Sequence, residues 1–315
     1  MENLNKILNT NPSAKNLFLN LKAQVDKLHR HTRQGSYKTR ERYYYTMLVF
    51  CKFLAIFFHL EKLGNISGKH ICAFIEFRQK EGLSASTIKA DLCAIRYYHD
   101  QMTDPKYRLP SNNELAVDLE RRRFAEKDRS WTEQEYENFL KLAEDLRRKD
   151  YAHAMTLAHE LGLRIHEVFR LDTATAIAAL KTDKITVVGK GGKVRTVPLT
   201  LAARAVLEDR LKVTMPGEKL FVRPEEMTHI AIENLEKFIR TYRDQIRDPS
   251  QPVSLTFHGL RHTYAANTYR QLIQKGRTQS EAQSMVSQLL GHERTDVTKI
   301  YIVGCKEGYD TYLYQ

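Results

Sequence analysis

The stretch His258-Gly259-Leu260-Arg261-His262 places two histidines and an arginine at the start of a helix predicted over residues 258–271. His258 and Arg261 are three residues apart, so they lie one turn apart on the same side of that helix. The first turn of a helix attracts anions, because its backbone N–H groups are free and the helix dipole is positive there. The stretch therefore predicts a helical element that presents an anion site, such as a phosphate site, at its N-terminus.

Four other strings carry residues of complementary chemistry, in a fixed order along the chain. They are Gly162-Leu163-Arg164-Ile165-His166-Glu167, Val188-Gly189-Lys190-Gly191, Leu290-Gly291-His292 and Val297-Thr298-Lys299-Ile300-Tyr301. Guanidinium groups can bind the non-bridging oxygens of a phosphodiester in pairs. A phenol has a pKa of about 10, so Tyr301 would need cations and a base to act as a nucleophile at neutral pH. Together the strings contain the groups that cut and rejoin a phosphodiester without a metal.

Each of these residues also has an ordinary explanation when it is considered alone. A single arginine or lysine of this kind is usually a surface or capping residue, and a single histidine usually belongs to a buried polar network. Glu167 is either a plain helix-face carboxylate or a group that orients Arg164 or accepts a hydrogen bond from His262. Gly162 also predicts a helix end. The order of the strings, rather than any one residue, indicates a shared site.

The five strings resemble those of the tyrosine recombinases, the family that includes phage integrases and Xer-like proteins, and the resemblance spans roughly residues 37–303. It implies that Arg164 and Arg261 bind the scissile phosphate. It also implies that Tyr301 is the nucleophile and that His258 accepts the proton of its phenol.

The same resemblance assigns roles to the remaining candidates. Lys190 would be the general acid for the leaving 5′ oxygen, and His292 would donate a hydrogen bond to a non-bridging oxygen. Glu167 and His262 would contact and orient the catalytic residues without contacting the scissile phosphate. No cofactor and no metal are expected, because the sequence lacks the second histidine of a zinc protease motif and the spacing of a phosphate-binding loop.

The charge balance favours a nucleic-acid partner. Fifty Lys and Arg residues against 38 Asp and Glu residues give a net charge of +12, and most of the excess lies in residues 1–130. Such cations release counterions from phosphates, although a charged, solvated face would look similar. The side chains that we expect to contact DNA phosphates are Arg30, Arg33, Lys38, Arg40, Arg42, Lys89 and Arg96.

Cysteine usage and hydropathy point to a cytoplasmic protein. The four cysteines are far apart and form no CxxC pair, which argues against a disulfide framework and a zinc site. The N-terminus lacks the order of a signal peptide. The most apolar run, residues 47–60, is shorter than the ~20 residues of a membrane helix. We expect no membrane partner and a nucleoid-associated location, in a prokaryotic or mobile-element-encoded protein.

Hydrophobic periodicity predicts a mainly α fold with a small β-sheet. Helices are expected over residues 14–30, 37–60, 67–79, 84–101, 201–211, 225–246, 258–271, 280–290 and 296–302. Strands are expected over residues 184–188 and 193–199, joined as a hairpin through Gly189 to Gly192. The Thr132-x-x-Glu135 pattern is a capping box that starts another helix just after Trp131.

The segments between these elements suggest five regions. Residues 1–36 form an N-terminal extension, residues 103–130 a linker and residues 304–315 a C-terminal tail. Residues 37–102 resemble the helical, SAM-like core-binding domain that contacts DNA in tyrosine recombinases. Residues 131–303 form the α+β catalytic domain.

These features predict a site-specific DNA recombinase that acts on duplex DNA at specific recombination sites, as the integrase or transposase of a mobile element. The resemblance implies a 3′-phosphotyrosyl intermediate, a Holliday junction and a homotetramer on DNA that exchanges C-terminal tails. Three alternatives stay open: Xer-like resolution of chromosome dimers, a type IB topoisomerase-like activity and a DNA-binding regulator. A regulator would need the cations but not Tyr301, and a junction-forming assay separates a recombinase from a topoisomerase.

Overall fold

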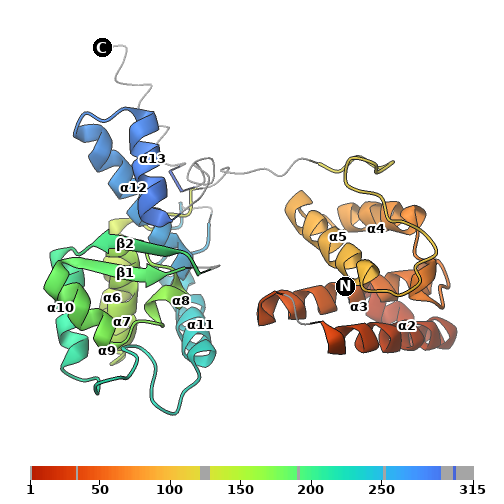
Figure 1. The fold of residues 1–315 in the computed structure, drawn as a ribbon, viewed down its shortest axis with the longest axis horizontal. Coiled ribbons are helices and arrows are strands. Elements are labelled where there is room, and N and C mark those ends of the chain that lie inside the picture. The colour runs from red at the N-terminus through yellow and green to blue at the C-terminus, as the bar shows by residue number, and fades with distance from the viewer. Residues whose placement is uncertain are drawn as a thin grey trace. The chain divides into compact units, whose positions relative to one another are not determined.

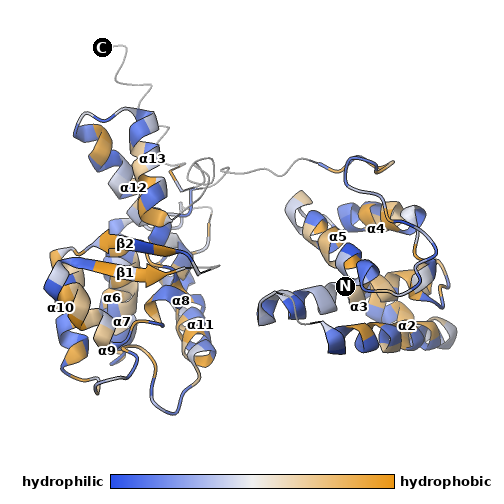
Figure 2. Ribbon diagram, in the orientation of Figure 1, coloured by the Kyte–Doolittle hydropathy of each residue, from blue (hydrophilic) through white to orange (hydrophobic). Residues whose placement is uncertain are grey.

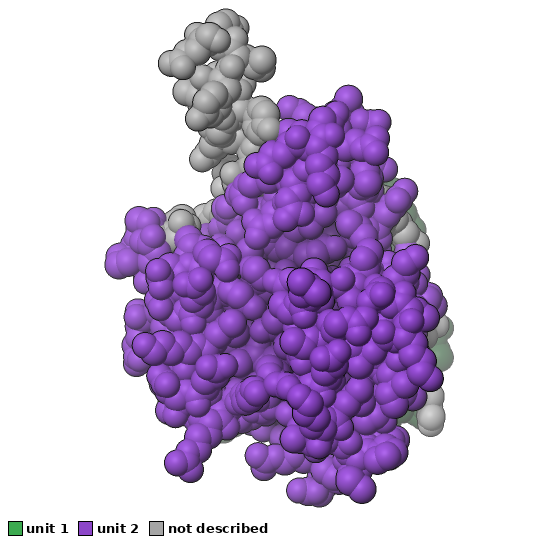
Figure 3. Space-filling model, turned by 90° about the vertical axis from the view of Figure 1, so that its left-hand side faces the viewer, with its two compact units in different colours: residues 1–123 green, residues 124–315 purple. Residues whose placement is uncertain are grey.

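The protein, seen here as a computed structural model, consists of two compact units, residues 1–123 and 124–315 (Figure 1, Figure 3). The structure describes residues 2–32, 35–120, 128–189, 192–250, 253–291 and 301–302. Each unit has a hydrophobic core of its own. The predicted fold class is confirmed, since the described residues form helices and one two-stranded sheet. None of the described helices is long and apolar enough to span a membrane.

Unit 1 (residues 1–123) is a group of amphipathic helices whose apolar sides meet (Figure 2). Its elements are α1 (Glu2–Thr10), α2 (Pro12–His31), α3 (Tyr37–Phe57), the 3-10 turn η1 (Leu63–Asn65), α4 (Gly68–Lys80) and α5 (Ala85–Asp100). Helix α3 packs against both α2 and α5. Helix α2 starts two residues before its predicted start, because the Asn11 side chain caps it and Pro12 suits the first helical position. Helix α1 was not predicted.

A buried polar network joins three helices of unit 1. Arg78 on α4 donates from Nε and Nη2 to Asp91 Oδ2 on α5, at 3.1 and 3.0 Å. Thr46 on α3 donates to the other carboxylate oxygen of Asp91 at 3.2 Å. Buried charges are tolerated only when they are paired and hydrogen-bonded, so this network determines how α3, α4 and α5 meet.

Unit 2 (residues 124–315) is built around α7, which packs against α6, α10 and α12. Its elements are α6 (Glu133–Asp145), α7 (Lys149–Leu161), α8 (Ile165–Val168), α9 (Thr173–Thr182), β1 (Lys184–Val188), β2 (Val194–Pro198), α10 (Leu201–Leu211), α11 (Thr228–Ile246), α12 (Phe257–Gln274) and α13 (Gln279–Leu290). The predicted hairpin is confirmed: β1 and β2 are antiparallel, and their pairs run from Lys184 with Pro198 to Val188 with Val194. The end of α7 at Gly162 was predicted, but the start of α7 and the helices α8 and α9 were not.

The start of unit 2 is bonded to the start of α12. Trp131 donates from its indole nitrogen to the carbonyl of Thr256 at 2.9 Å and from its backbone to Thr263 Oγ1 at 2.8 Å. The predicted capping box is confirmed, since Thr132 and Glu135 satisfy each other's backbone N–H groups. Trp131, which precedes Thr256 by 125 positions, therefore holds the helix that carries His258 and Arg261.

Helices α12 and α13 enclose a smaller apolar cluster that includes Tyr301 and Ile302. The two helices run side by side at the top of unit 2 in Figure 1. Tyr301 and Ile302 form a turn and a bend, so the helix predicted over residues 296–302 is wrong for these two positions. Burial of both side chains against α12 and α13 outweighs the local helical pattern. Residues 296–300 lie outside the described part of the chain.

We expect Gly162→Ala to destabilise unit 2 by about 2–5 kcal/mol. Gly162 ends α7 with φ of +61°, and a Cβ there would lie 2.4 Å from Tyr264 Cδ1. An unfavourable left-handed conformation of about 1–2 kcal/mol therefore adds to an overpacking cost of about 1–3 kcal/mol. Denaturant unfolding followed by Trp131 fluorescence measures this, because Trp131 is the single tryptophan and is buried in the core of unit 2.

The matched control is Gly217→Ala, because Gly217 has φ of +87° and open space around its Cβ position. It isolates the conformational cost from the clash. Equal losses of unfolding free energy in the two variants would show that the clash with Tyr264 does not contribute to the destabilisation.

Candidate active site

The first two turns of α12 carry three of the predicted residues, His258, Arg261 and His262. Thr256 caps this helix by accepting from the backbone N–H of Gly259 at 3.3 Å. A Cβ on Gly259 would lie 2.5 Å from the indole nitrogen of Trp131, so only glycine allows this close contact. The Trp131 anchor thus positions the helix end on which the site is built.

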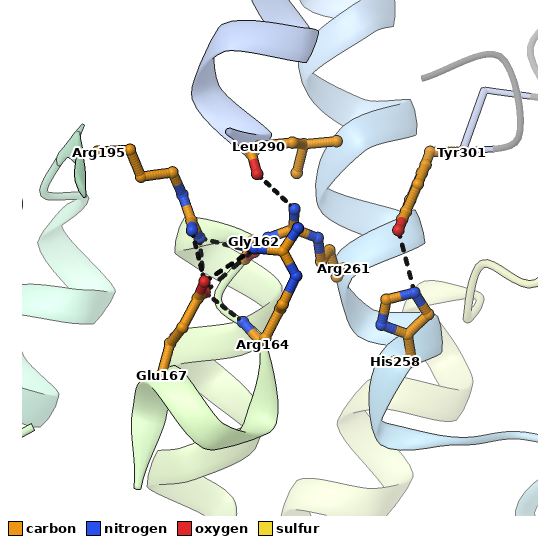
Figure 4. Close-up of polar contacts among 8 residues, drawn as sticks. All are labelled: Gly162, Arg164, Glu167, Arg195, His258, Arg261, Leu290 and Tyr301. Carbon is orange, nitrogen blue, oxygen red and sulfur yellow. Dashed lines mark hydrogen bonds and ion pairs between the residues drawn. The ribbon is translucent and has the colours of Figure 1, made fainter. Parts of the chain in front are cut away.

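Tyr301 lies against these residues, as Figure 4 shows for His258. His258 Nε2 and the phenolic oxygen of Tyr301 are 3.1 Å apart and share a hydrogen bond. The ring of His262 stacks on the ring of Tyr301, with centroids 4.2 Å apart. The guanidinium carbon of Arg261 lies 5.9 Å from the centre of the Tyr301 ring. The structure therefore brings together residues that are up to 43 positions apart in sequence.

Arg261 is completely buried, which is rare for an arginine. It donates to the carbonyl oxygens of Gly162, after the end of α7, and of Leu290, the last residue of α13. Burial, together with the positive charges of Arg164 and Arg195, lowers its pKa to about 10. The guanidinium stays protonated at neutral pH and brings a desolvated positive charge to the site.

Arg164, the residue before α8, and Glu167, the third residue of α8, form a capping pair. Glu167 accepts from the backbone N–H of Arg164 at 2.8 Å and from its guanidinium Nη1 at 2.9 Å. The prediction that Glu167 orients the Arg164 guanidinium agrees with this contact. Within the described residues, Nε and Nη2 of Arg164 bond to no other group, and the side chain is 24% exposed. Arg164 therefore retains donors for a ligand.

Arg195 on β2 is a third arginine of this cluster, and the sequence did not single it out. Its Nη1 and Nη2 donate to the two carboxylate oxygens of Glu167, at 2.6 and 2.7 Å (Figure 4). Burial alone would raise the pKa of Glu167, but the hydrogen bonds and charges of Arg195 and Arg164 lower it to about 2. The available sequence signal was position: Arg195 is two residues before the buried Val197, so both point to the same side of the strand.

His258 is suited to accept a proton. The residue as a whole is exposed, but its ring lies beside the rings of His262 and Tyr301, and the protein atoms around the ring displace part of its hydration. This loss of hydration, followed by the positive charges of Arg261, Arg164 and Arg129, lowers its pKa to about 4. A neutral imidazole at neutral pH can accept from the phenol of Tyr301 in the tautomer that carries its proton on Nδ1.

Lys190 and His292 lie outside the described residues, but their described neighbours reach the arginine cluster. A Cβ on Gly189 would lie 3.2 Å from Glu167 Oε1. A Cβ on Gly291, which ends α13, would lie 3.1 Å from Cδ of Arg195. The chain therefore approaches Glu167 and Arg195 immediately before both predicted residues.

A cavity of about 460 Å³ adjoins Arg164 and His258. Two arginines of α11, Arg240 and Arg243, line it one helical turn apart, and neither was among the predicted site residues. Together with Arg129, they add positive charge around the site, and this charge would attract a polyanion. Within the described ranges, no cluster of histidine, cysteine, aspartate or glutamate side chains could hold a metal ion.

The basic residues expected to contact DNA from unit 1 differ in their surroundings. The exposed ones are Arg30, Lys38 and Arg42. The ones whose side chains donate to backbone carbonyls of the protein are Arg40, Lys89 and Arg96. Arg33 lies outside the described residues. Which of them contact DNA stays a prediction. Arg96 in particular holds the segment after α5, through Pro110 and Asn112.

Comparisons with known proteins give matches over both units. A model described as "Phage integrase family" matches residues 129–306, and one described as "Phage integrase, N-terminal SAM-like domain" matches residues 28–105. A tyrosine recombinase XerC from Caldanaerobacter subterraneus subsp. tengcongensis is 29% identical over 159 residues, which cover 49% of this chain and 41% of the relative. A tyrosine recombinase XerC from Vibrio vulnificus is 27% identical over 242 residues, which cover 70% of this chain and 67% of the relative.

Solved structures share the fold at lower identity. A lambda integrase dimer bound to a COC′ core site gives a TM-score of 0.65 at 19% identity, covering 92% of this chain and 79% of that one. The Tn1549 transposon integrase in complex with circular intermediate DNA gives a TM-score of 0.57 at 18% identity, covering 89% and 94%. The XerH recombinase in its post-cleavage complex gives 0.58 at 19% identity, covering 89% and 80%.

We expect the imidazole of His258 to titrate near pH 4 in the DNA-free protein, because lost hydration and nearby arginines lower its pKa to about 4. In the unfolded chain it would titrate near its ordinary value of about 6.5. The unfolded state therefore binds more protons between these values, and this group makes folding more favourable as the pH rises from about 4 to about 6.5. An NMR titration of the His258 ring protons measures the midpoint.

Arg129→Gln provides the control for this titration, since it removes one of the three positive charges that lower the pKa of His258 and leaves the ring unchanged. The midpoint of His258 should then move upward. A midpoint at the ordinary histidine value in the unmodified protein would contradict the electrostatic argument.

Proposed function

The chain belongs to the phage integrase family of tyrosine recombinases, which cut and rejoin DNA at specific sites, and we propose that Tyr301 is the residue that becomes linked to the DNA. Duplex DNA is the substrate of this enzyme family. The proposal extends the family activity to particular side chains of this chain.

One observation carries the assignment: the 3.1 Å hydrogen bond between the phenol of Tyr301 and His258 Nε2, beside a buried arginine. A base within hydrogen-bond reach of a hydroxyl is the arrangement that activates a weak nucleophile. The chain contains sixteen tyrosines, and among the described ones Tyr301 is the one bonded to His258.

The proposed step is an in-line displacement at the scissile phosphorus. The oxygen of Tyr301 forms a bond to phosphorus while its proton moves to His258 Nε2, and the bond from phosphorus to the 5′ oxygen breaks. Lys190 donates a proton to the departing oxygen. The products are a 3′-phosphotyrosyl link and a free 5′-hydroxyl. The link keeps the phosphoester energy, so a 5′-hydroxyl from a second strand can reverse the step without ATP.

Charge stabilisation in this step would come from Arg164 and Arg261, with His292 donating to a non-bridging oxygen. Arg164 has donors available, whereas Arg261 is buried, so a phosphate must displace the atoms that cover Arg261 before it can bond to it directly. Glu167 and His262 hold these groups in place through their contacts with Arg164 and Tyr301. Each preorganised donor to a developing oxyanion is worth roughly 3 to 4 kcal/mol.

We expect Tyr301→Phe to abolish the covalent adduct on nicked suicide DNA while leaving DNA affinity nearly unchanged. The substitution removes the attacking oxygen and keeps the ring that stacks on His262. Denaturing gels of end-labelled DNA detect the adduct, and a mobility-shift titration measures affinity.

The matched control is Tyr312→Phe, a tyrosine outside the Val-Thr-x-x-Tyr string, which should keep the adduct. Cleavage by the unmodified protein should also proceed in excess EDTA, since the proposed charges are side chains. An adduct that persists in Tyr301→Phe would move the nucleophile to another residue, and loss of cleavage in EDTA would overturn the metal-free mechanism.

For the biological role, we propose integration or transposition of a mobile element, acting in the cytoplasm at the nucleoid. The likeness of the fold to a transposon integrase supports this role. The XerC names of two curated relatives favour the second candidate, resolution of chromosome dimers. Sequencing the DNA that is trapped covalently on the protein in cells distinguishes the two, because an element end and a chromosomal resolution site differ.

We further propose that the enzyme acts as a homotetramer on paired sites, with C-terminal tails exchanged between protomers. Residues 303–315 lie outside the described part of the chain, and the proposal rests on the family membership. Removing residues 306–315 should weaken cooperative assembly on paired sites and leave single-site binding nearly unaltered. Sedimentation of the protein on one-site and two-site DNA measures this. Unchanged assembly after truncation would overturn tail exchange and leave the assignment of Tyr301 intact.

A further inference from the structure

Arg195 links four parts of the catalytic unit. Its guanidinium holds both oxygens of Glu167, and its Nη2 also donates to the carbonyl of Gly162 at 3.4 Å. Its Cδ lies 3.1 Å from the position that a Cβ on Gly291 would take. The side chain is 7% exposed, so the protein encloses it almost completely. Helix α8, the end of α7, the end of α13 and strand β2 therefore meet at one residue.

The charge of Arg195 also matters for the other two arginines. Glu167 has no exposed side-chain surface, and it lies 2.9 Å from Arg164 and 4.0 Å from Arg261. A lone carboxylate there would offset one of the two positive charges intended for the phosphate. Because Arg195 forms a bidentate pair with Glu167, the carboxylate can orient Arg164 while Arg164 and Arg261 keep their net charge for an anion.

Arg195 is in addition the point where the β1–β2 hairpin is fastened to α8. It pairs with Val187 across the hairpin, one pair before Val188 with Val194, and the chain between those strands contains Lys190. The backbone N–H of Gly189 donates to the carbonyl of Lys193 at 2.6 Å, which extends the pairing of the two strands by one residue beyond Val188 and Val194. The bond from Arg195 to Glu167 thus ties the base of the Lys190 turn to the helix of Arg164.

We propose that Arg195 is a positioning residue: it holds the facing ends of β1 and β2, between which Lys190 lies in the sequence, against the Arg164–Glu167 pair, so that Lys190 can act on the leaving oxygen while Arg164 binds the phosphate. The inference rests on the proposed general-acid role of Lys190. It differs from a purely structural role because it links Arg195 to one chemical event, the protonation of the 5′ oxygen.

The test compares Arg195→Lys and Arg195→Gln on two suicide substrates, one with a normal 5′ oxygen and one with sulfur at the 5′ bridging position. A thiolate leaves without a proton, since thiols have a pKa of about 8.5. Arg195→Lys keeps the positive charge but cannot form the bidentate pair with Glu167. A displacement of a catalytic group by about 1 Å can lower the rate about 100-fold. We expect such a loss on normal DNA and recovery to within a few fold of the unmodified protein on the sulfur substrate.

The control is Arg204→Gln, which removes an arginine of the same unit that is paired with Asp183 at the surface. It should cleave both substrates at the unmodified rate. Trp131 fluorescence during unfolding identifies any variant that does not fold, and Arg195→Lys then serves in place of Arg195→Gln. An equal loss on both substrates, or no loss on normal DNA, overturns the proposal.

Lys190→Ala separates failure of this inference from failure of the general-acid assignment. If the sulfur substrate rescues Lys190→Ala but not Arg195→Lys, Arg195 does not position Lys190. If it rescues neither, the general-acid assignment itself fails. Hydrogen exchange over residues 184–198 then decides the remaining question: faster exchange in Arg195→Lys than in the unmodified protein supports the fastening of the hairpin, and unchanged exchange overturns it.

Discussion

The catalytic unit depends on a single buried carboxylate that holds positive charges together. Arg164, Arg195 and Arg261 lie within 4.0 Å of Glu167, and Glu167 has no exposed side-chain surface. Like charges at such distances repel strongly where water is excluded, so the cluster would not assemble without an anion among them. Removing one partner of a buried ion pair typically costs about 3–5 kcal/mol. The same excess of positive charge that makes the cluster costly in the free protein gives it affinity for a phosphodiester.

Two helix ends contribute to this balance. Arg261 donates to carbonyls at the C-terminal ends of α7 and α13, where the helix dipole is negative and carbonyl groups lack partners within the helix. Both helices end in a glycine with positive φ, Gly162 or Gly291. These glycines let the chain turn away close to an arginine side chain. The ends of these two helices therefore also bind the buried guanidinium of Arg261.

The position of Tyr301 connects this electrostatic cluster to the chemistry of DNA cleavage. Its phenol bonds to His258, its ring stacks on His262, and Arg261 lies behind the ring. His258 stays neutral because lost hydration and, after it, the neighbouring arginines lower its pKa, so the charges that would attract a phosphate also help to keep the base able to accept a proton. The first turns of α12 carry His258, Arg261 and His262. Trp131, near the start of unit 2, holds the beginning of that helix through its hydrogen bond to Thr256.

The sequence by itself determined the local features, because caps, hairpins and amphipathic helices depend on residues a few positions apart. Thr132 with Glu135, the strand pair around Gly189 and the helix end at Gly162 could all be read in this way, and so could the pairing of Arg164 with Glu167. Only the tertiary structure decided that Arg195 is buried against Glu167, 28 positions away, and that Arg240 and Arg243 line the cavity beside the site. An arginine on a strand or helix is normally solvated. Whether it is buried depends on which carboxylate the folded chain brings to it, and no local pattern encodes that distance.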